Sequence, residues 1–358
     1  MTRKKPVDTT LELRPDARFD VVDMRRRLHE DCHEILEGYP RTLYVSHHTT
    51  AGYLDGRIAE RLGHDPEAIR QFVGVFRKAF PPQAGYHHDQ LERRTELTDE
   101  EKVNEPLNAD SHLTFISAGL VNCLASEAAD ETPVWWVELD GTHGSHRRLR
   151  RTTVIGYHDE EAVDRLEIQV PVASHGFDSV NLRDPELGVF EQLQAMVDAA
   201  GIRNGRIDLS LGRRERAAGL VVNEYETLLM KQDLKEVLGD PLRYVAEKGR
   251  HMLANPRSIP GKTLSYARYD VPQVLREAFQ VLGLSESVVE RLLGRLMGFP
   301  ASRFLRMKQQ VALPVVAPGD TTTGTILQGT YQSPILVQWN GPGKRGSRAL
   351  EVRLVELA

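Results

Sequence analysis

The 358-residue sequence has few cysteines and few aromatic residues, and it lacks any long apolar run. Two cysteines, Cys32 and Cys123, are too few for a disulfide scaffold, and they fall in stretches that predict a helix and a strand interior. We therefore expect buried thiols in a reducing compartment. No stretch has the length of a membrane span or of a signal-peptide core, so we expect a cytoplasmic protein without a membrane partner.

The charge balance also excludes some classes of partner. A formal net charge of −5 at pH 7 gives no overall basic character that would attract nucleic acid or an anionic membrane. Apolar residues make up 40% of the chain and charged residues 27%, which is typical of a globular protein. The length is sufficient for two domains of ordinary size.

Motifs of fixed spacing do not pin the geometry of a metal site here, because Cys-x-x-Cys is absent and none of the histidine clusters described next has the His-Glu-x-x-His spacing. The chain instead has three separated histidine clusters. Residues 47–50 (His-His-Thr-Thr) follow an alternating strand pattern at residues 43–46, and the others are residues 86–89 (Tyr-His-His-Asp) and 108–112 (Asn-Ala-Asp-Ser-His). Three histidines from separate segments are the usual ligands of an open metal site. The alternative is that these clusters are ordinary polar turns.

The remaining patterns of the first half alternate between strands and helices. Asp65, with Pro66 after it, predicts the start of a helix with an apolar stripe, and Pro81-Pro82 its end. Asp20 is a candidate cap for an earlier helix that Gly38 ends. The other elements that we expect are strands at residues 9–13, 134–141 and 147–154, the last of them basic, and a solvated loop at residues 93–102.

From residue 164 the same order of patterns begins again. A strand at residues 166–170, a helix at residues 185–200 and a strand at residues 207–211 repeat the first half, and residues 335–348 echo residues 134–151. We therefore predict two tandem domains, at residues 8–158 and 163–358. The second carries a helical insertion at about residues 231–300.

The ordered histidine motifs resemble those of the YjbQ-like family, whose assigned activity is secondary thiamine-phosphate synthase. The resemblance rests on residues 48–52, on Tyr86 and His88, and on residues 108–113. It implies the α+β fold class, with two tandem YjbQ-like β-sandwich-type domains and flanking helices. It also implies a homo-oligomer and a histidine-rich site for a divalent metal, with Zn²⁺ expected on His48, His88 and His112.

The two predicted copies have lost different parts of the motif series. In the second copy Glu215, Arg216 and Ala217 stand where the first has His48, Thr49 and Thr50. Tyr269 or Arg268 stands in place of His88, and Phe304 in place of His112. The second copy keeps residues 223–224 (Asn-Glu) and 329–332 (Gly-Thr-Tyr-Gln), which the first lacks. Complementary loss predicts one composite site, because a site shared across an interface needs each part only once.

Each candidate residue has a chemical role in such a site. Asp110 is expected to orient a histidine or to join the coordination, and Glu224 to act as general acid or base. Thr49, Thr50 and Gln332 are expected to position substrate oxygens. The candidates for a phosphate are Arg147, Arg148, Lys344 and Arg345, although exposed charge is the simpler explanation for most of them. Further histidines that compete for the metal are His47, His87, His143 and His146.

Three classes of function are compatible with these features. The first is a metal-dependent enzyme acting on a small phosphorylated or heterocyclic substrate, such as a thiamine-phosphate-synthase-like transferase. The second is a non-catalytic ligand-binding or scaffold protein. The third is a nucleic-acid-binding regulator that uses the inserted helix at residues 271–297, but the apolar stripe of that segment is more simply a core.

Overall fold

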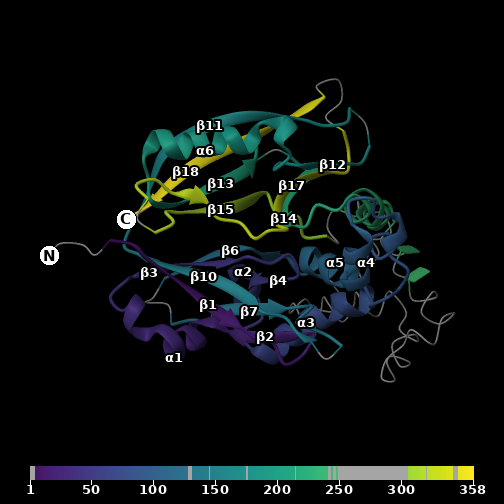
Figure 1. Ribbon diagram of the computed structural model, residues 1–358, viewed down its shortest axis with the longest axis horizontal. Helices are drawn as coiled ribbons and strands as arrows, with labels where there is room; N and C mark the ends of the chain where they lie inside the picture. Colours follow the sequence, from purple (N-terminus) through teal and green to yellow (C-terminus); the bar gives the residue numbers. More distant parts are fainter. Residues whose placement is uncertain are drawn as a thin grey trace.

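The computed structural model describes residues 5–127, 131–144, 146–174, 176–213, 215–240, 243–244, 247–248, 305–319, 321–341 and 346–358, without the side chains of residues 32–34. The protein is a mixed α+β molecule in which every strand pairing of the described residues is antiparallel. Figure 1 shows one half, from β1 to β10, stacked against the other, from β11 to β18. No helix in these ranges is long and apolar enough to cross a membrane.

The first half contains two four-stranded sheets. One has the order β1 (Val7–Leu13), β10 (Arg150–Tyr157), β3 (Arg41–Ser46), β6 (Cys123–Glu127); the other has the order β2 (Asp20–Asp23), β7 (Trp135–Glu138), β4 (Ala51–Leu54), β5 (Leu120–Val121). Leu11, Tyr44 and Val154 of the first sheet share a core with Tyr53 and Trp136 of the second, so the sheets pack face to face. A small hairpin, β8 (Thr142–His143) and β9 (His146–Arg147), follows β7.

The helices of the first half are α1 (Met24–Leu36), α2 (Gly56–Arg61), α3 (Pro66–Ala79), η1 (Leu91–Arg93), α4 (Asp99–Asn104) and α5 (Ala109–Ala118). Asp65 caps α3 as predicted. The expected cap at Asp20 is wrong, because Asp20 lies in β2 and Asp23 accepts the first amide hydrogens of α1. The expected loop at residues 93–102 is also wrong, because Thr98 and Glu101 form a capping box that starts α4.

The second half repeats the two-sheet arrangement. One sheet has the order β11 (Glu160–Pro171), β18 (Ser347–Leu357), β13 (Asn204–Leu211), β15 (Gln310–Val316), β16 (Thr325–Ile326); the other has the order β12 (Asp178–Asn181), β17 (Ser333–Gln338), β14 (Ala218–Asn223). Its helical elements are η3 (Pro185–Leu187), α6 (Val189–Ala200), the π-helical turn η4 (Leu229–Asp233) and α7 (Leu234–Gly239). Apart from α7, most of the predicted insertion lies outside the described residues, as do Arg268, Tyr269 and Phe304.

The strand registers of the two halves correspond position by position. Ala51 pairs with Glu138 in the first half, and Ala218 pairs with Gln338 in the second. Ser46 donates its amide hydrogen to the carbonyl oxygen of Asn122, and Leu211 does the same to Gln309. On this register Gly56 and Thr132 of the first half correspond to Asn223 and Gln332 of the second. The turn after β13 is two residues longer than the turn after β3.

The two halves also share one apolar core. A single cluster contains Leu54 and Val137 from the first half together with Val221 and Val337 from the second. Helices α3 and α5 contribute Phe72, Phe76 and Phe115 to the same cluster. Because this burial stabilises both halves at once, the junction between them has a fixed geometry on which a site can be built.

Candidate active site

A cavity of about 370 Å³ lies at the junction of the two halves. Five of the predicted site residues line it, namely His48, Thr49, Thr50, Arg148 and Glu224. The remaining lining residues are His47, Glu105, Pro106, Asn108, Leu149, Arg150 and Tyr331. Glu224 and Tyr331 come from the second half and all the others from the first, so this cavity does not exist without both.

The turn at residues 46–50 is held from both halves. Ser46 donates its hydroxyl hydrogen to the carbonyl oxygen of Ala51 (2.6 Å) and accepts the amide hydrogen of His48 (3.2 Å). Gln332 donates both amide hydrogens to this turn, at 3.0 Å to the carbonyl oxygen of Ser46 and 2.8 Å to that of His48. Gln332 therefore clamps the turn, and no amide hydrogen is left for the predicted substrate contact.

Two further contacts from the second half tighten this clamp. Asn223 donates a side-chain hydrogen to the carbonyl oxygen of Thr49 at 3.1 Å. Gly329 lies so close to the turn that a Cβ atom there would overlap the carbonyl oxygen of His47. Only glycine fits at that position, because the obstacle is backbone and cannot rotate away.

His48 and His47 both contact strand β10. The Nε2 atom of His48 accepts the amide hydrogen of Arg151 at 2.7 Å, and Nε2 of His47 lies 2.9 Å from the hydroxyl of Thr153. Burial and the positive charge of Arg150 lower the pKa of His48 to about 3. His48 is therefore neutral at physiological pH, with only Nδ1 left for another partner.

His88 and His112 lie deeper, with ring centroids 5.2 Å apart and both side chains fully buried. Nδ1 of His88 is 3.0 Å from Asp89, and Nδ1 of His112 is 2.7 Å from the side-chain oxygen of Asn223. That oxygen also accepts the amide hydrogen of Glu224, so it acts only as an acceptor and Nδ1 of His112 carries the proton. Neither Nε2 atom has a hydrogen-bond partner among the described residues.

Glu224 faces His112 across the junction. Its Oε2 atom lies 3.6 Å from Nε2 of His112, so the lone pair of a neutral imidazole faces a carboxylate oxygen. Two acceptors at this distance in a buried site require a cation or a proton between them. Two ligand atoms bound to a tetrahedral Zn²⁺ lie about 3.4 Å apart, so the pair fits a divalent metal. His88 is a further nitrogen donor close to the pair.

The pKa values of the two buried imidazoles, His88 and His112, are shifted in opposite directions. Burial and the charge of His88 lower the pKa of His112 to about 3. Burial also opposes the charged form of His88, but its hydrogen bond to Asp89 and the negative charges around it outweigh burial and raise its pKa. The environments of the two rings thus move their pKa values in opposite directions, as is common in acid–base sites.

Arg94 is a charged residue of this site that the sequence did not indicate, because it falls in the expected loop. Only 3% of its side chain is exposed, and it pairs with Glu96 at 2.6 Å, Glu105 at 3.1 Å and Glu224 at 3.5 Å. It therefore pairs with Oε1 of Glu224, while His112 approaches Oε2. The orienting residues Asp89 and Asn223 lie within the motifs at residues 86–89 and 223–224, but neither of them was assigned a role from the sequence.

Several predicted site residues contact partners other than the predicted ones. Asp110 does not orient a histidine; it binds Arg18 at 2.9 and 3.1 Å, and burial raises its pKa to about 7 although Arg18 opposes that rise. Arg147 is exposed and pairs with Asp16. Arg148 lines the cavity, binds Asp140 at 2.8 Å and keeps a buried Nε without a partner among the described residues. Lys344 and Arg345 lie outside the described residues.

The predicted trio of metal ligands is not assembled in this structure. Within the described residues, only His87, Asp233 and Glu236 place one ligand atom each within 4.8 Å of the others. Those atoms already have hydrogen-bond partners, since Nε2 of His87 lies 2.9 Å from Glu236 and Asp233 accepts the amide hydrogens of residues 87 and 88. Between His112 and Glu224, by contrast, two lone pairs are left facing each other.

The comparisons with known proteins concern the fold only. No family model matches the sequence, and no curated protein does. Among solved structures, a YbjQ-like protein of unknown function from Sulfolobus solfataricus P2 is 19% identical over 55% of this chain and 99% of that chain, with a TM-score of 0.29. An uncharacterized conserved protein of the YjbQ/UPF0047 family from Clostridium acetobutylicum is 13% identical over 54% of this chain and 99% of its own, with a TM-score of 0.24.

Proposed function

We propose that the junction cavity is the active site of a metal-dependent enzyme that acts on a small anionic substrate. The observation that carries the proposal is the 3.6 Å approach of His112 Nε2 to Glu224 Oε2, an acceptor facing an acceptor in a buried site. His112 and Glu224 would hold a divalent cation, with His88 as a further nitrogen donor. Zn²⁺ suits such a set of imidazole and carboxylate donors.

The chain's own groups supply the other functions of such a site. A bound divalent metal would polarise a substrate oxygen or lower the pKa of a bound water. Arg148 would bind the anionic group of the substrate, since it lines the cavity and its guanidinium retains an unused N–H. Thr49 would add a hydroxyl contact, and Glu105 would move a proton. Burial raises the pKa of Glu105, as suits a group that carries a proton.

We also propose that the two halves are tandem copies of a YjbQ-like fold, which would make thiamine-phosphate-synthase-like transfer one candidate reaction. Support comes from the ordered sequence motifs and from the matching strand registers of the two halves. On this proposal the copies have divided one site between them, with imidazoles from the first half and Asn223 and Glu224 from the second.

The test is metal binding by the purified chain. We expect about one Zn²⁺ per chain, and a loss of affinity of roughly tenfold or more when His112 is replaced by glutamine, because one ligand is lost. His146→Gln is the matched control, since His146 is exposed on the small hairpin. Absence of metal binding, or equal binding by wild type and His112→Gln, would contradict the proposal.

A second candidate function is a non-catalytic binding protein. It is favoured by the engagement of two expected catalytic groups in structural contacts, since Gln332 clamps the turn and His48 is bonded to Arg151. Binding of phosphate or carboxylate compounds that remain unchanged on prolonged incubation with the zinc-loaded protein would favour this function over an enzyme.

A further inference from the structure

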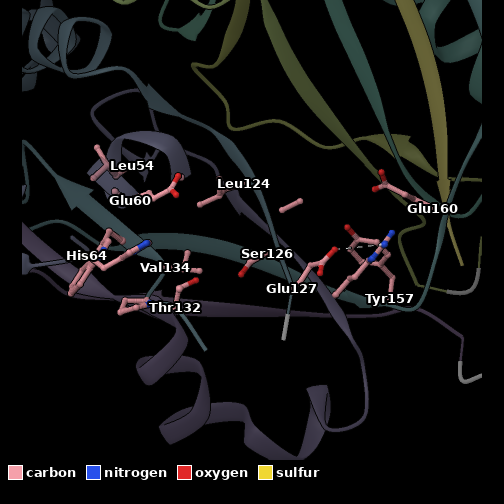
Figure 2. A pocket seen from close by; sticks show the side chains of 16 residues that line it. Leu54, Glu60, His64, Leu124, Ser126, Glu127, Thr132, Val134, Tyr157 and Glu160 are labelled. Atoms are coloured by element: carbon pink, nitrogen blue, oxygen red, sulfur yellow. Dashed lines mark ion pairs between the residues drawn. The ribbon is translucent and has the colours of Figure 1, made fainter. Parts of the chain in front are cut away.

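Strand β6 borders two cavities that differ in charge. Along its later residues lies a groove of about 600 Å³ between α2, β6 and the start of β7, and Figure 2 shows Glu127 and Glu160 among the side chains that line it. At its first residue, Cys123, lies a smaller cavity of about 170 Å³. Among the described residues, the charged side chains that line this smaller cavity are Arg306 and Lys308. Both are basic, so we call it the basic cavity.

The basic cavity lies at the junction of the two halves but apart from the candidate active site, since the described residues include none that lines both. The first half lines it with α5, β5 and residues 122–123, and the second half with β14, β15, Arg306 and Lys308. The remaining lining is mostly apolar, so a charge inside it is weakly screened. Pockets for drug-sized ligands have about 300–1,000 Å³, so this cavity admits only a small ion or molecule.

Arg306 has no hydrogen-bond acceptor and no acidic partner among the described residues. Its guanidinium lies 5.4 Å from the centre of the Phe72 ring, and its Cδ would be 3.2 Å from a Cβ atom added at Gly119. Neither contact accepts a hydrogen bond from its N–H groups, which number five in a guanidinium. Burial and the charge of Arg61 lower the pKa of Arg306, although Asp55 opposes this shift. The surroundings therefore disfavour the charge that this side chain carries.

The acidic side chain nearest to these cations is already paired. Asp55 binds Lys308 at 2.8 Å, which balances one basic group and leaves Arg306 and the exposed Arg61. Helix α5 ends beside Arg306, and the carbonyl groups of a helix C-terminus carry about half a negative charge. That partial charge offsets only part of the two remaining positive charges. The basic cavity therefore keeps a net positive charge that the described residues do not balance.

We propose that the basic cavity binds a small, doubly charged oxyanion of the phosphate type, held by Arg306 and Lys308. A guanidinium fork binds two oxygen atoms of such an ion, and an ammonium group adds a second charge. The small volume favours a free inorganic ion over the phosphoryl group of a larger molecule. Because the cavity has walls from both halves, the bound ion stabilises the junction between them. This site is independent of the candidate active site and of its metal.

The test is urea unfolding of the full chain with and without inorganic phosphate, at constant ionic strength. All proteins carry Arg148→Gln, which limits phosphate binding in the candidate active site. We expect phosphate to raise the urea midpoint, because a ligand of the folded state stabilises it. Adding Arg306→Gln should raise the phosphate concentration needed roughly tenfold or more, and Arg306→Lys should raise it less. Arg243→Gln, at an exposed arginine paired with Glu247, is the matched control. No midpoint shift, or an equal shift with Arg306→Gln, overturns the inference.

A thiol in the wall of the basic cavity reports where the ion binds. In a Cys32→Ser chain, Cys123 is the single thiol, and it lines this cavity. We expect phosphate to slow its labelling by the neutral reagent N-ethylmaleimide, with half of the effect at the concentration that gives half of the midpoint shift. Labelling that phosphate does not slow overturns the inference. Equal protection by glycerol phosphate, which carries the same charge on a larger molecule, overturns the assignment to a free ion.

Discussion

The two halves of the molecule contain the same buried arginine at the same place but give it different partners. In the first half Arg150 forms two 2.7 Å hydrogen bonds to Glu138, and in the second half Arg348 donates one of 2.9 Å to Gln338. Arg348 also binds Glu215, in the longer turn of its half. Each arginine ties a residue of its turn to the facing sheet, although the chemistry of the two turns differs.

The difference shows which features belong to the fold and which to the site. The arginine, the strand registers and the face-to-face sheets are common to both halves. The imidazoles occur only in the first half, and the carboxylate that faces them occurs only in the second. On the proposal of tandem copies, a shared site of this kind lets each half lose what the other supplies.

The largest effect is expected from removing the first of these arginines. Arg150→Met leaves the carboxylate of Glu138, which is 1% exposed, without a counter-charge, and such losses cost about 3–5 kcal/mol. Arg348→Met leaves only a neutral amide and the half-buried Glu215, so we expect about 1–3 kcal/mol. Urea unfolding of both variants measures the difference. Equal costs would show that the two bridges are equivalent after all.

The next effect concerns the clamp that the second half places on the first. Gly329→Ala puts a methyl group onto the carbonyl oxygen of His47, so we expect a loss of about 1–3 kcal/mol and weaker metal binding. Gly74→Ala in α3 is the control, since nothing lies within 4 Å of its added methyl, and it should stabilise by about 0.5–1 kcal/mol. Unchanged metal affinity in Gly329→Ala would mean that the turn's position does not matter.

A smaller difference between the turns of the two halves is the dependence of stability on pH, which only the first turn should show. His48 has a folded-state pKa of about 3 against an ordinary 6.5, so the folded protein binds fewer protons than the unfolded chain between these values. Its contribution is complete above pH 6.5 and is lost as pH falls toward 3. The turn of the second half has no histidine. His48→Gln should therefore reduce the slope of stability against pH by about 1 kcal/mol per unit near pH 5; an unchanged slope in urea unfolding would contradict this.

The smallest effect distinguishes two neighbouring arginines of the first half. Arg148 lines the cavity whereas Arg147 is exposed beside Asp16, so Arg148→Gln should weaken binding of inorganic phosphate and Arg147→Gln should change it little. Surface ion pairs such as that of Arg147 contribute about 0–1 kcal/mol. Isothermal titration of phosphate into both variants makes the comparison, and an equal loss in both would place the anion outside the cavity.

Much of the scaffold was predictable because its signals are local. Alternation marked β3, the Asp65 and Pro66 pair marked the start of α3, and Gly201 marked the end of α6. The cap at Asp20 was misplaced, and the helix that Thr98 caps was expected to be a loop, because several polar residues nearby compete for the same role. Cys123, expected to be buried, is only half-buried, because it begins the edge strand β6 and lines a cavity.

The site was predictable as a set of residues but not as a geometry. The motifs selected His88, His112 and Glu224, which the fold brings close together. They did not show that Nε2 of His48 accepts the amide hydrogen of Arg151. They also did not show that Gln332 donates both amide hydrogens to backbone carbonyl oxygens. These contacts depend on backbone groups from distant strands, which carry no sequence signature. Arg94 was not identified because it falls in the segment that was expected to be a solvated loop.

The account's central claim is that one cation is held jointly by His112 of the first half and Glu224 of the second. A double-mutant cycle on Zn²⁺ affinity, using His112→Gln, Glu224→Gln and the double variant, tests it most directly. The account predicts that each single change weakens binding and that the double variant is little weaker than either one. Additive losses, or a Glu224→Gln protein that binds Zn²⁺ as tightly as wild type, would contradict a shared site.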